Sequence, residues 1–440
     1  MNTSSLAGHA IELTDSIVKS TLPADRIISD YYRQRRYIGS HDRRWITDKI
    51  YGIIRNFIFL REISKGCSEF GKVGDAMVIF LIHEIRLAEM NADEIKNSYS
   101  QLLDVYEMSE KKIDVENLVT CANDVATKLI SDPVNHLIMN SFPDFFCEFL
   151  PQPVREECDY IMTALNHEAR VCVRVDTEKI SREHAMDILK ENGAELSVAK
   201  YSPFGIYLSR RINLNTVDLY KNGSIEVQDE ASQLVGLIVN PQEGETIVDA
   251  CAGAGGKSLE FAALSKGKSK IVALDVDEVR LSNLRIRAMR SGYENIRVMK
   301  IGIDDFAGVD KMLGVADKVI VDAPCTGSGT IRRNPEKKFR LSKQSVDKAA
   351  AYQKKLLKHY SELVKVGGFI SYVTCSIFEE ENQAVIDYFL GSVQNFKKID
   401  VSTLLIDTKF AGMIEDGFLM IYPHRYDMDG FFVAVMERVM

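Results

Sequence analysis

The 440-residue sequence predicts an α/β fold in which a parallel sheet, covered by helices on both faces, follows a helical region and a small α+β module. Three observations predict it. From about Ser224 onward, short apolar runs alternate with segments of helical periodicity, which is the pattern of a doubly wound sheet. Residues 8 to 130 show helical apolar spacing throughout. The residues between them mix both patterns, so we expect three domains, at 1–130, 131–225 and 226–440.

The first two regions differ in their local patterns. Apolar residues recur at helical spacing in ITDKIYGIIRNFIFLREI and DAMVIFLIHEIRLAEM, which favours an all-helical domain. The next region contains a helix near Asp144–Leu150, a strand in ARVCVRVDT, a helix at Arg182–Asn192 and a strand in GIYLSR. This order indicates a compact α+β module.

The third region reads as strands and helices in alternation. We expect strands at TIVDA, KIVALDV, IRVMKI, KVIVDA and GFISYVT, and helices at Ser258–Leu264, Glu278–Arg290, Val346–Val364 and Glu379–Leu390. Two final apolar runs, FLMIYP and GFFVAVMERV, are separated by a short link. They predict an antiparallel hairpin added to the parallel sheet.

Composition excludes several classes of protein. With 46% apolar and 27% charged residues, the chain is suited to a packed core and not to disorder. No run approaches the ~20 apolar residues of a membrane-spanning helix, and the N-terminus lacks the features of a secretory signal, so we expect a cytoplasmic protein with no membrane partner. The eight cysteines form no CxxC pair, which predicts reduced thiols. The eight histidines are dispersed, and no metal site is expected.

Positive charge is concentrated in two segments, although the net charge is −8. Residues 26–61 hold nine Lys or Arg against three Asp, and residues 331–358 hold ten against two acidic residues. Each cluster could be a solvated helical face. Two such clusters in a chain that also carries a catalytic motif favour a nucleic-acid partner.

A glycine-rich loop follows the first strand of the third region, in VDACAGAGGKS (Val248–Ser258). Such a loop suits a dinucleotide, a phosphate or S-adenosylmethionine (AdoMet), or is only a tight turn. Asp275 ends the next strand, 22 residues after Gly253, where doubly wound folds hold ribose hydroxyls. A strand-end cap is the alternative for Asp275. Together, loop and acid indicate an adenosine-containing cofactor.

Two thiols and a carboxylate are expected at the same edge of the sheet. One strand runs into DAPCTGSGTIRRNP (Asp322–Pro335) and the next into YVTCS (Tyr372–Ser376). Because ligands bind at the carboxyl ends of parallel strands, Asp322, Cys325 and Cys375 should converge with the glycine loop. A lone cysteine is usually a buried structural residue. Two at adjacent strand ends point to chemistry.

That chemistry fits methylation of a pyrimidine at carbon 5. Addition of a thiolate to carbon 6 makes carbon 5 an enamine carbon that can attack a methyl sulfonium. Asp322 would hold the base near its ring nitrogen, and a second thiol would assist release of the first. The residues alone leave open which cysteine is the nucleophile.

These motifs resemble those of the Sun/Fmu-type (RsmB-like) ribosomal RNA cytosine-5 methyltransferases, within the wider Nol/Nop/Sun family. The resemblance covers essentially the whole chain. Its matching pieces are VQDEASQLVG, CAGAGGKS, VALDVDEVRL, DAPCTGSGTIRRNP, VGGFISYVTCSIFEEEN and DGFFVAVMER. It implies a Rossmann-like AdoMet methyltransferase domain, an N-terminal NusB-like RNA-binding domain with HDRRWITDKIYGIIRN as its signature, and a small RRM-like module.

The resemblance also implies roles for particular residues. Cys375 looks like the nucleophile, Cys325 like the thiol that aids product release, and Asp322 like the acid that borders both cofactor and target base. Asp275 is similar to the ribose-binding acid, and Asp304, with Asp305 as a rival, to the acid that meets the adenine. The residues similar to the AdoMet loop are Cys251, Ala252, Gly253, Ala254, Gly255, Gly256 and Lys257.

RNA is therefore the expected partner, and no DNA partner is expected. We also expect the enzyme to be a monomer. The residues expected to meet RNA phosphates are Arg43, Arg44, Arg332, Arg333, Lys337 and Lys338. We expect the target in small-subunit (16S) ribosomal RNA, because this domain architecture resembles that of the rRNA enzyme. The same chemistry on tRNA is the alternative.

The motifs disfavour two other classes of function. A non-catalytic ribosome-assembly factor is disfavoured because both cysteines and the glycine loop are intact. A small-molecule or protein N-methyltransferase usually has an Asn-Pro-Pro-Tyr-like tetrad at this position. This chain has Asp-Ala-Pro-Cys at Asp322–Cys325, which disfavours that class.

Overall fold

The structure is a computed structural model that describes residues 1–109, 112–209, 212–302 and 309–440. Contacts within the chain divide it into two compact units. One comprises Met1–His167 with Ile331–Lys343, and the other Glu168–Thr330 with Gln344–Met440. The boundary expected at residue 130 therefore lies inside the first unit. Within the described ranges, no helix is both long enough and apolar enough to cross a membrane.

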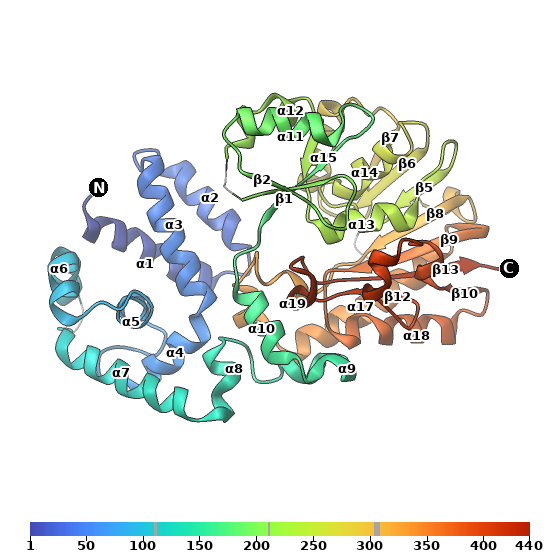
Figure 1. Ribbon diagram of the computed structural model, residues 1–440. Helices are drawn as coiled ribbons and strands as arrows, with labels where there is room; N and C mark the ends of the chain where they lie inside the picture. The colour runs from blue at the N-terminus through green and yellow to red at the C-terminus, as the bar shows by residue number, and fades with distance from the viewer. Residues whose placement is uncertain (110–111, 210–211, 303–308) are drawn as a thin grey trace. The chain divides into compact units, whose positions relative to one another are not determined.

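The first unit is helical (Figure 1). Its helices are α1 (Thr3–Lys19), α2 (Ala24–Gln34), α3 (Ser40–Arg55), α4 (Phe57–Gly66), α5 (Ala76–Arg86), α6 (Ala92–Ser109), α7 (Val115–Ser131), α8 (His136–Met139), α9 (Gln152–Arg155), α10 (Cys158–Asn166) and α16 (Lys337–Arg340).

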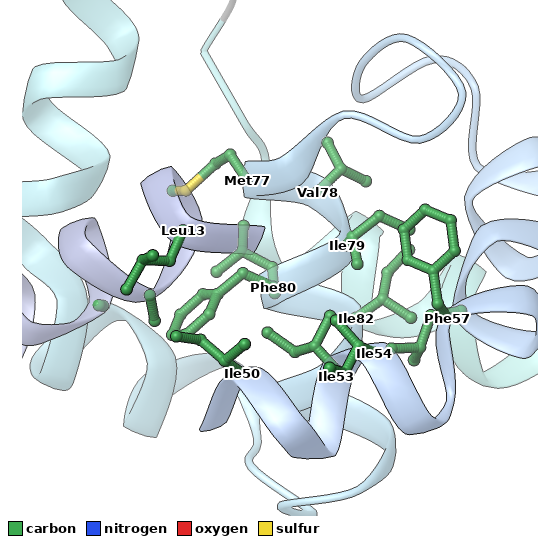
Figure 2. Packing of buried hydrophobic residues seen from close by; sticks show 14 of the residues in the cluster. Leu13, Ile50, Ile53, Ile54, Phe57, Met77, Val78, Ile79, Phe80 and Ile82 are labelled. Atoms are coloured by element: carbon green, nitrogen blue, oxygen red, sulfur yellow. The ribbon is translucent and has the colours of Figure 1, made fainter. Parts of the chain in front are cut away.

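Helix α5 forms the centre of this unit. Asp75 caps it by accepting the main-chain N–H groups of Met77 and Val78. Residues Met77–Ile85 are all buried, and all of them except His83 and Glu84 are apolar, as expected for a helix at the centre of a core. Figure 2 shows Phe80 of α5 packed among Leu13 of α1 and Ile50 of α3.

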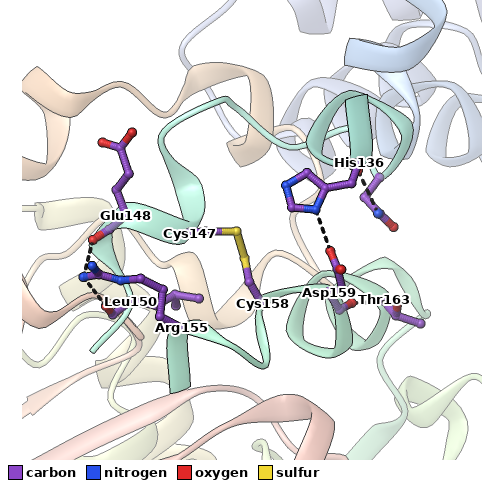
Figure 3. The surroundings of a disulfide bond; sticks show 9 residues. His136, Cys147, Glu148, Leu150, Arg155, Cys158, Asp159 and Thr163 are labelled. Carbon is purple, nitrogen blue, oxygen red and sulfur yellow. Dashed lines mark hydrogen bonds and ion pairs between the residues drawn. A yellow bond between two sulfur atoms is a disulfide. The ribbon is translucent and has the colours of Figure 1, made fainter. Parts of the chain in front are cut away.

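Four of the eight cysteines form two disulfides, which corrects the expectation of reduced thiols. Cys67 pairs with Cys121, 54 residues away, and Cys147 pairs with Cys158 (Figure 3). The Cα atoms of the two pairs lie 6.0 and 5.8 Å apart. Helix packing brings these residues together, so the missing CxxC spacing carried no information about them.

The second unit begins with the α+β module that the sequence predicts. It consists of β1 (Val171–Val175), α11 (Arg182–Glu191), β2 (Leu196–Val198), β3 (Gly205–Leu208), α12 (Asp218–Lys221) and β4 (Ile225–Val227). The strands form a sheet in the order β2-β3-β1-β4, and each neighbouring pair is antiparallel.

The rest of this unit is the doubly wound domain. Its elements are α13 (Glu230–Val239), β5 (Thr246–Asp249), α14 (Gly256–Leu264), β6 (Lys270–Asp275), α15 (Glu278–Arg290), β7 (Ile296–Lys300), β8 (Ala316–Asp322), α17 (Lys343–Ser361), β9 (Val364–Thr374), α18 (Gln383–Ser392), β10 (Phe396–Ile399), β11 (Ile414–Glu415), β12 (Phe418–Ile421), α19 (Pro423–Tyr426) and β13 (Phe431–Arg438).

The described residues of this domain form a sheet in the order β11-β12-β13-β9-β8-β5-β6-β7, with β10 paired to β13. Strands β5 to β9 are parallel, and β12 and β13 form the expected antiparallel hairpin. The chain moves outward from β5 in one direction to β7 and in the other to β9. Because such crossovers are right-handed, helices α14 and α15 cover one face and α17 the other (Figure 1).

This topology determines where ligands meet the protein. Strand order reverses between β5 and β8, and the carboxyl ends of the parallel strands lie along one edge. Ligands of doubly wound folds bind at this switch point. The glycine loop after β5 and the two cysteine loops after β8 and β9 all begin there.

Candidate active site

The glycine loop joins β5 to α14 by a turn that requires glycine. Gly253 and Gly255 have φ angles of +54° and +84°, a region that side-chain-bearing residues rarely adopt. A Cβ on Gly255 would overlap the side chain of Leu284. At Gly253 and Gly256, a Cβ would meet no atom within 4 Å. The loop therefore presents bare backbone and the N-terminus of α14 to open space.

Asp275 ties this loop to the end of β6. Its Oδ2 accepts the main-chain N–H of Gly253 at 2.8 Å, and its Oδ1 accepts that of Asp277 at 2.8 Å. The side chain therefore does cap the strand end, which was the alternative explanation for this residue. It also stands beside the loop, where a carboxylate can accept ribose hydroxyls. Asp304 and Asp305 lie outside the described residues.

Two arginines hold the carbonyl groups of the loop. Arg287 of α15 donates to the main-chain oxygen of Ala254 at 2.6 Å, and Arg174 of β1 donates to that of Gly256 at 3.0 Å. Arg174 is buried and lies 3.6 Å from Glu260. Burial raises the pKa of Glu260 to about 7, against the attraction of Arg174. The α+β module thus contacts the glycine loop directly, a contact that no local sequence pattern predicts.

Lys257 and Asp322 form an ion pair beside the loop. The Nζ atom of Lys257 donates to Oδ2 of Asp322 at 2.8 Å and lies 5.4 Å from the ring centre of Phe431. Burial lowers the pKa of Lys257, but the charge and hydrogen bond of Asp322 outweigh it and raise the pKa overall. Lys257 is therefore a cation that faces the carboxylate expected to border the target base.

The two thiols of the DAPC and TCS motifs lie side by side. Cys325 follows β8 and Cys375 follows β9, and their Sγ atoms are 3.2 Å apart. The parallel pairing of β8 with β9, in which Asp322 aligns with Val373, brings them together. Burial and the nearby carboxylates Asp322 and Asp249 raise the thiol pKa of Cys251 well above the ordinary value. Cys251 is suited to lining the loop and not to nucleophilic attack.

The basic segment after Cys325 is placed differently from the expectation. Lys338 is 1% exposed, and its Nζ donates to the main-chain oxygens of Arg55 and Asn140 and to Oδ1 of Asn166. Burial, followed by the charge of Arg55, lowers its pKa well below the usual range. Arg332 is also buried. The structure therefore corrects the expectation that these two side chains reach RNA phosphates, because the segment packs within the helical unit.

The other residues expected to bind RNA are more accessible. Arg333 and Lys337 are half-buried. Arg43 donates to the main-chain oxygen of Ile38, and its guanidinium lies over the ring of Tyr32. The side chain of Arg44 is 85% exposed. Within the described ranges, no group of three or more His, Cys, Asp or Glu residues is arranged to hold a metal ion.

Solved structures share this architecture. The crystal structure of PH0851 superposes with a TM-score of 0.80 at 25% sequence identity, covering 100% of this chain and 99% of that one. A methyltransferase homolog from Pyrococcus horikoshii superposes with a TM-score of 0.58 at 24% identity, covering 70% of this chain and 99% of that one. The chain therefore shares the Rossmann-like α/β fold of these structures.

Sequence comparisons identify the family. Residues 236–437 match the family described as 16S rRNA methyltransferase RsmB/F, and residues 142–215 match the ferredoxin-like domain of the same family. The chain is 30% identical over 300 residues to the probable ribosomal RNA small subunit methyltransferase B of Synechocystis, covering 68% of this chain and 67% of that one. The chain belongs to the RsmB/F family.

A second relative matches over a smaller share of its length. The probable ribosomal RNA small subunit methyltransferase B of Bacillus subtilis is 31% identical over 266 residues, which are 60% of this chain and 59% of that protein. The match therefore spans less than two thirds of this relative.

Proposed function

We propose that this protein transfers a methyl group from AdoMet to carbon 5 of a cytosine in small-subunit ribosomal RNA, through a covalent adduct of Cys375 with carbon 6 of the base. The observation that carries the proposal is the pair of thiols 3.2 Å apart at the carboxyl ends of β8 and β9. N-methyl transfer has no use for two adjacent thiols. Membership of the RsmB/F family, whose relatives are named for small-subunit rRNA, supports the choice of RNA.

The residues around the glycine loop fit AdoMet. Open space in front of Gly253 and Gly256 leaves room for an adenosine moiety, and the Asp275 carboxylate can accept its ribose hydroxyls. The carboxylates of Asp275 and Asp322, both near the loop, suit a positively charged sulfonium. AdoMet supplies an electrophilic methyl group when bound there.

The first step belongs to Cys375. Its thiolate adds to carbon 6 of the cytosine, forming an S–C6 bond and breaking the π bond between carbons 5 and 6. The displaced electrons move onto the ring between carbon 5 and N3. The Asp322 carboxylate would accept the exocyclic amino group beside that nitrogen, and the paired Lys257 ammonium would offset the negative charge that develops there, so that the addition occurs with the base already oriented.

The later steps belong to Cys325. Carbon 5 is now the nucleophile for the methyl group, and after methylation it carries both a proton and the methyl group. Cys325 takes that proton, and the electron pair of the C5–H bond restores the double bond as Cys375 leaves as thiolate. The short distance between the two sulfur atoms puts the proton acceptor next to the bond that breaks.

The target base must leave any stacked helix before Cys375 can reach it. Carbon 6 is shielded in a duplex, so we propose that the enzyme acts on a single-stranded or flipped nucleotide. Arg44 and Arg43 of the helical unit, together with the half-exposed Arg333 and Lys337, are proposed to contact the phosphates. The helical unit is proposed to serve as an RNA-binding domain of the NusB-like type.

Transfer of labelled methyl groups tests this function. Unmodified small-subunit rRNA and bulk tRNA would each be incubated with labelled AdoMet and the wild-type protein, and the label would be mapped to a nucleotide and an atom. The proposal expects 5-methylcytosine in the rRNA. Label only in tRNA would overturn the substrate, label on an exocyclic nitrogen would overturn the chemistry, and no label on either RNA would favour an assembly factor.

A further inference from the structure

Glu381 is a buried acid that the sequence did not single out. It ends the short 3-10 helix Glu379–Glu381 between β9 and α18 and is 0% exposed. Its Oε1 accepts the hydroxyl groups of Ser376, at 2.7 Å, and of Thr326. Its Oε2 accepts the main-chain N–H of Thr326 and the side-chain amide of Gln353, both at 2.9 Å. Four donors match the acceptor capacity of one ionised carboxylate.

The donors that Glu381 binds are next to the two thiols. Thr326 follows Cys325 in the chain, and Ser376 follows Cys375. Gln353 of α17 binds Glu381 and the main-chain oxygen of Pro324, which precedes Cys325. A single carboxylate therefore links the loop after β8 to the loop after β9, at the residues beside each sulfur.

A second set of hydrogen bonds supports the same connection. Because Ser376 donates its hydroxyl proton to Glu381, Ser328 is the donor in the 2.9 Å contact between the two serine hydroxyls. The main-chain N–H of Gly329 donates to the main-chain oxygen of Cys375 at 3.0 Å. The charge on Glu381 thus sets the direction of the hydroxyl network between the loops.

The two thiols do not depend equally on Glu381. Cys375 directly follows Thr374, the last residue of β9, which pairs with Phe432 of β13. Cys325 lies three residues beyond Asp322, the end of β8, in a loop. Thr326 also supplies two of the four hydrogen bonds of Glu381. Loss of the carboxylate therefore releases the Cys325 loop more than the Cys375 end.

We infer that Glu381 is a positioning residue that holds Cys325 against Cys375 for the release of the methylated base. The inference rests on the proposed function. Weakening the hydrogen bonds of Glu381 should leave Cys375 able to form its adduct, while Cys325 is no longer correctly placed to take the proton from the base. Geometric errors of this kind cost about a hundredfold in rate for a displacement of ~1 Å.

The variant Glu381→Gln tests this inference. It keeps the shape, but only one of the two polar atoms of the new amide is an acceptor, so two of the four donors lose their acceptor. The remaining hydrogen bonds are neutral and about half as strong as charge-assisted ones. We expect the turnover rate with AdoMet and rRNA to fall about tenfold or more, since losing the stabilisation of about one hydrogen bond in the transition state lowers a rate about tenfold. A denaturation-resistant protein–RNA adduct should accumulate over the same period. Glu379→Gln, the same change at an exposed residue of the same 3-10 helix, should behave as wild type.

Two milder variants keep the test informative if Glu381→Gln does not fold. Thr326→Val removes one donor on the Cys325 side and should accumulate adduct. Ser376→Ala removes one on the Cys375 side and should slow adduct formation instead. Equal behaviour of these two variants would overturn the asymmetry between the loops, and a folded Glu381→Gln protein that loses methyl transfer without accumulating adduct would overturn the positioning role.

The wild-type protein separates this inference from the function it rests on. Wild type that neither labels RNA nor forms an adduct defeats the proposed function. Wild type that labels cytosine at carbon 5, alongside a Glu381→Gln variant with unchanged turnover, defeats only the role of Glu381.

Discussion

The Sγ atom of Cys325 lies 3.2 Å from the Sγ atom of Cys375. The two residues are 50 positions apart in the chain, and the parallel pairing of β8 with β9 brings them together. Around them, Asp322 pairs with Lys257, and the glycine loop occupies the neighbouring strand end. This arrangement connects the fold to the proposed chemistry.

Arg174 is predicted to support cofactor binding from outside the glycine loop. Arg174→Met removes the donor to the Gly256 carbonyl and leaves Glu260 without its nearest buried cation. We expect the Kd for AdoMet to rise about tenfold, the effect of losing one charge-assisted hydrogen bond. Isothermal titration of AdoMet into the folded variant measures this.

Arg280→Met provides the control for this prediction, because its side chain is 63% exposed on α15. It should bind AdoMet as wild type does. Equal affinities for wild type and the Arg174 variant would show that the α+β module does not support the loop.

The raised pKa of Asp249 should make the stability of the protein depend on pH. Burial raises the pKa of this carboxyl group from 3.8 to about 7. The folded protein therefore holds a proton that the unfolded chain releases near pH 4, and the stabilisation declines as pH rises from about 4 through 7. Asp249→Asn cannot titrate, while its amide oxygen can still accept the Ser258 hydroxyl.

The measurement is the unfolding free energy at pH 5, 6 and 7 for both proteins. Wild type should lose stability relative to Asp249→Asn over this range. Parallel curves would mean that the Asp249 carboxyl titrates normally in the fold. Glu260, whose pKa burial raises to about 7, contributes a slope of the same sign in both proteins and cancels in the comparison.

The two disulfides predict a definite thiol count. Alkylation of denatured protein purified without reductant should label four cysteines, Cys172, Cys251, Cys325 and Cys375, and reduction should raise the number to eight. Mass spectrometry of the labelled peptides identifies them. Label on Cys67 or Cys147 before reduction would contradict the pairing.

Loss of the longer disulfide loop should also lower stability. Cys67→Ser opens the loop that joins two positions 54 residues apart. The disulfide that closes such a loop contributes roughly 2–4 kcal/mol by restricting the unfolded chain. Chemical denaturation of the variant and of wild type, each without reductant, measures the difference.

Lys338 is predicted to contribute to stability, and Arg44 to RNA binding. Lys338→Met should lower the melting temperature, because the main-chain oxygen of Arg55 and the side-chain oxygen of Asn166 each lose a hydrogen bond from the buried Lys338. Arg44→Gln should leave the melting temperature unchanged and reduce the salt dependence of RNA affinity by about 0.7–0.9 in log–log slope, the value for one phosphate contact. Filter binding at several salt concentrations distinguishes them, and an altered slope for Lys338→Met at unchanged stability would reverse the assignment.

Local sequence patterns predicted most of the doubly wound domain and the parts of the site that lie at strand ends. The apolar runs before Asp275, Asp322 and Cys375 are strands in the structure. Because the carboxyl ends of parallel strands share an edge, their proximity could be expected as well.

Features that depend on contacts between distant residues could not be predicted in this way. Lys338 looked like a surface cation until packing placed it against Arg55, 283 positions away. Arg174 is a charged residue in a strand and carries no motif signal, and within VGGFISYVTCSIFEEEN nothing distinguishes Glu381 from the two glutamates before it. Buried polar residues are recognised by their partners, and partners are a property of the fold.

The most direct test of the account compares covalent adducts of Cys325→Ala and Cys375→Ala with AdoMet and unmodified small-subunit rRNA. The account predicts that Cys325→Ala traps a protein–RNA adduct that survives denaturation, whereas Cys375→Ala forms none and transfers no methyl group. An adduct with Cys375→Ala, or methylation at the wild-type rate by that variant, would contradict the assignment of Cys375 as the nucleophile.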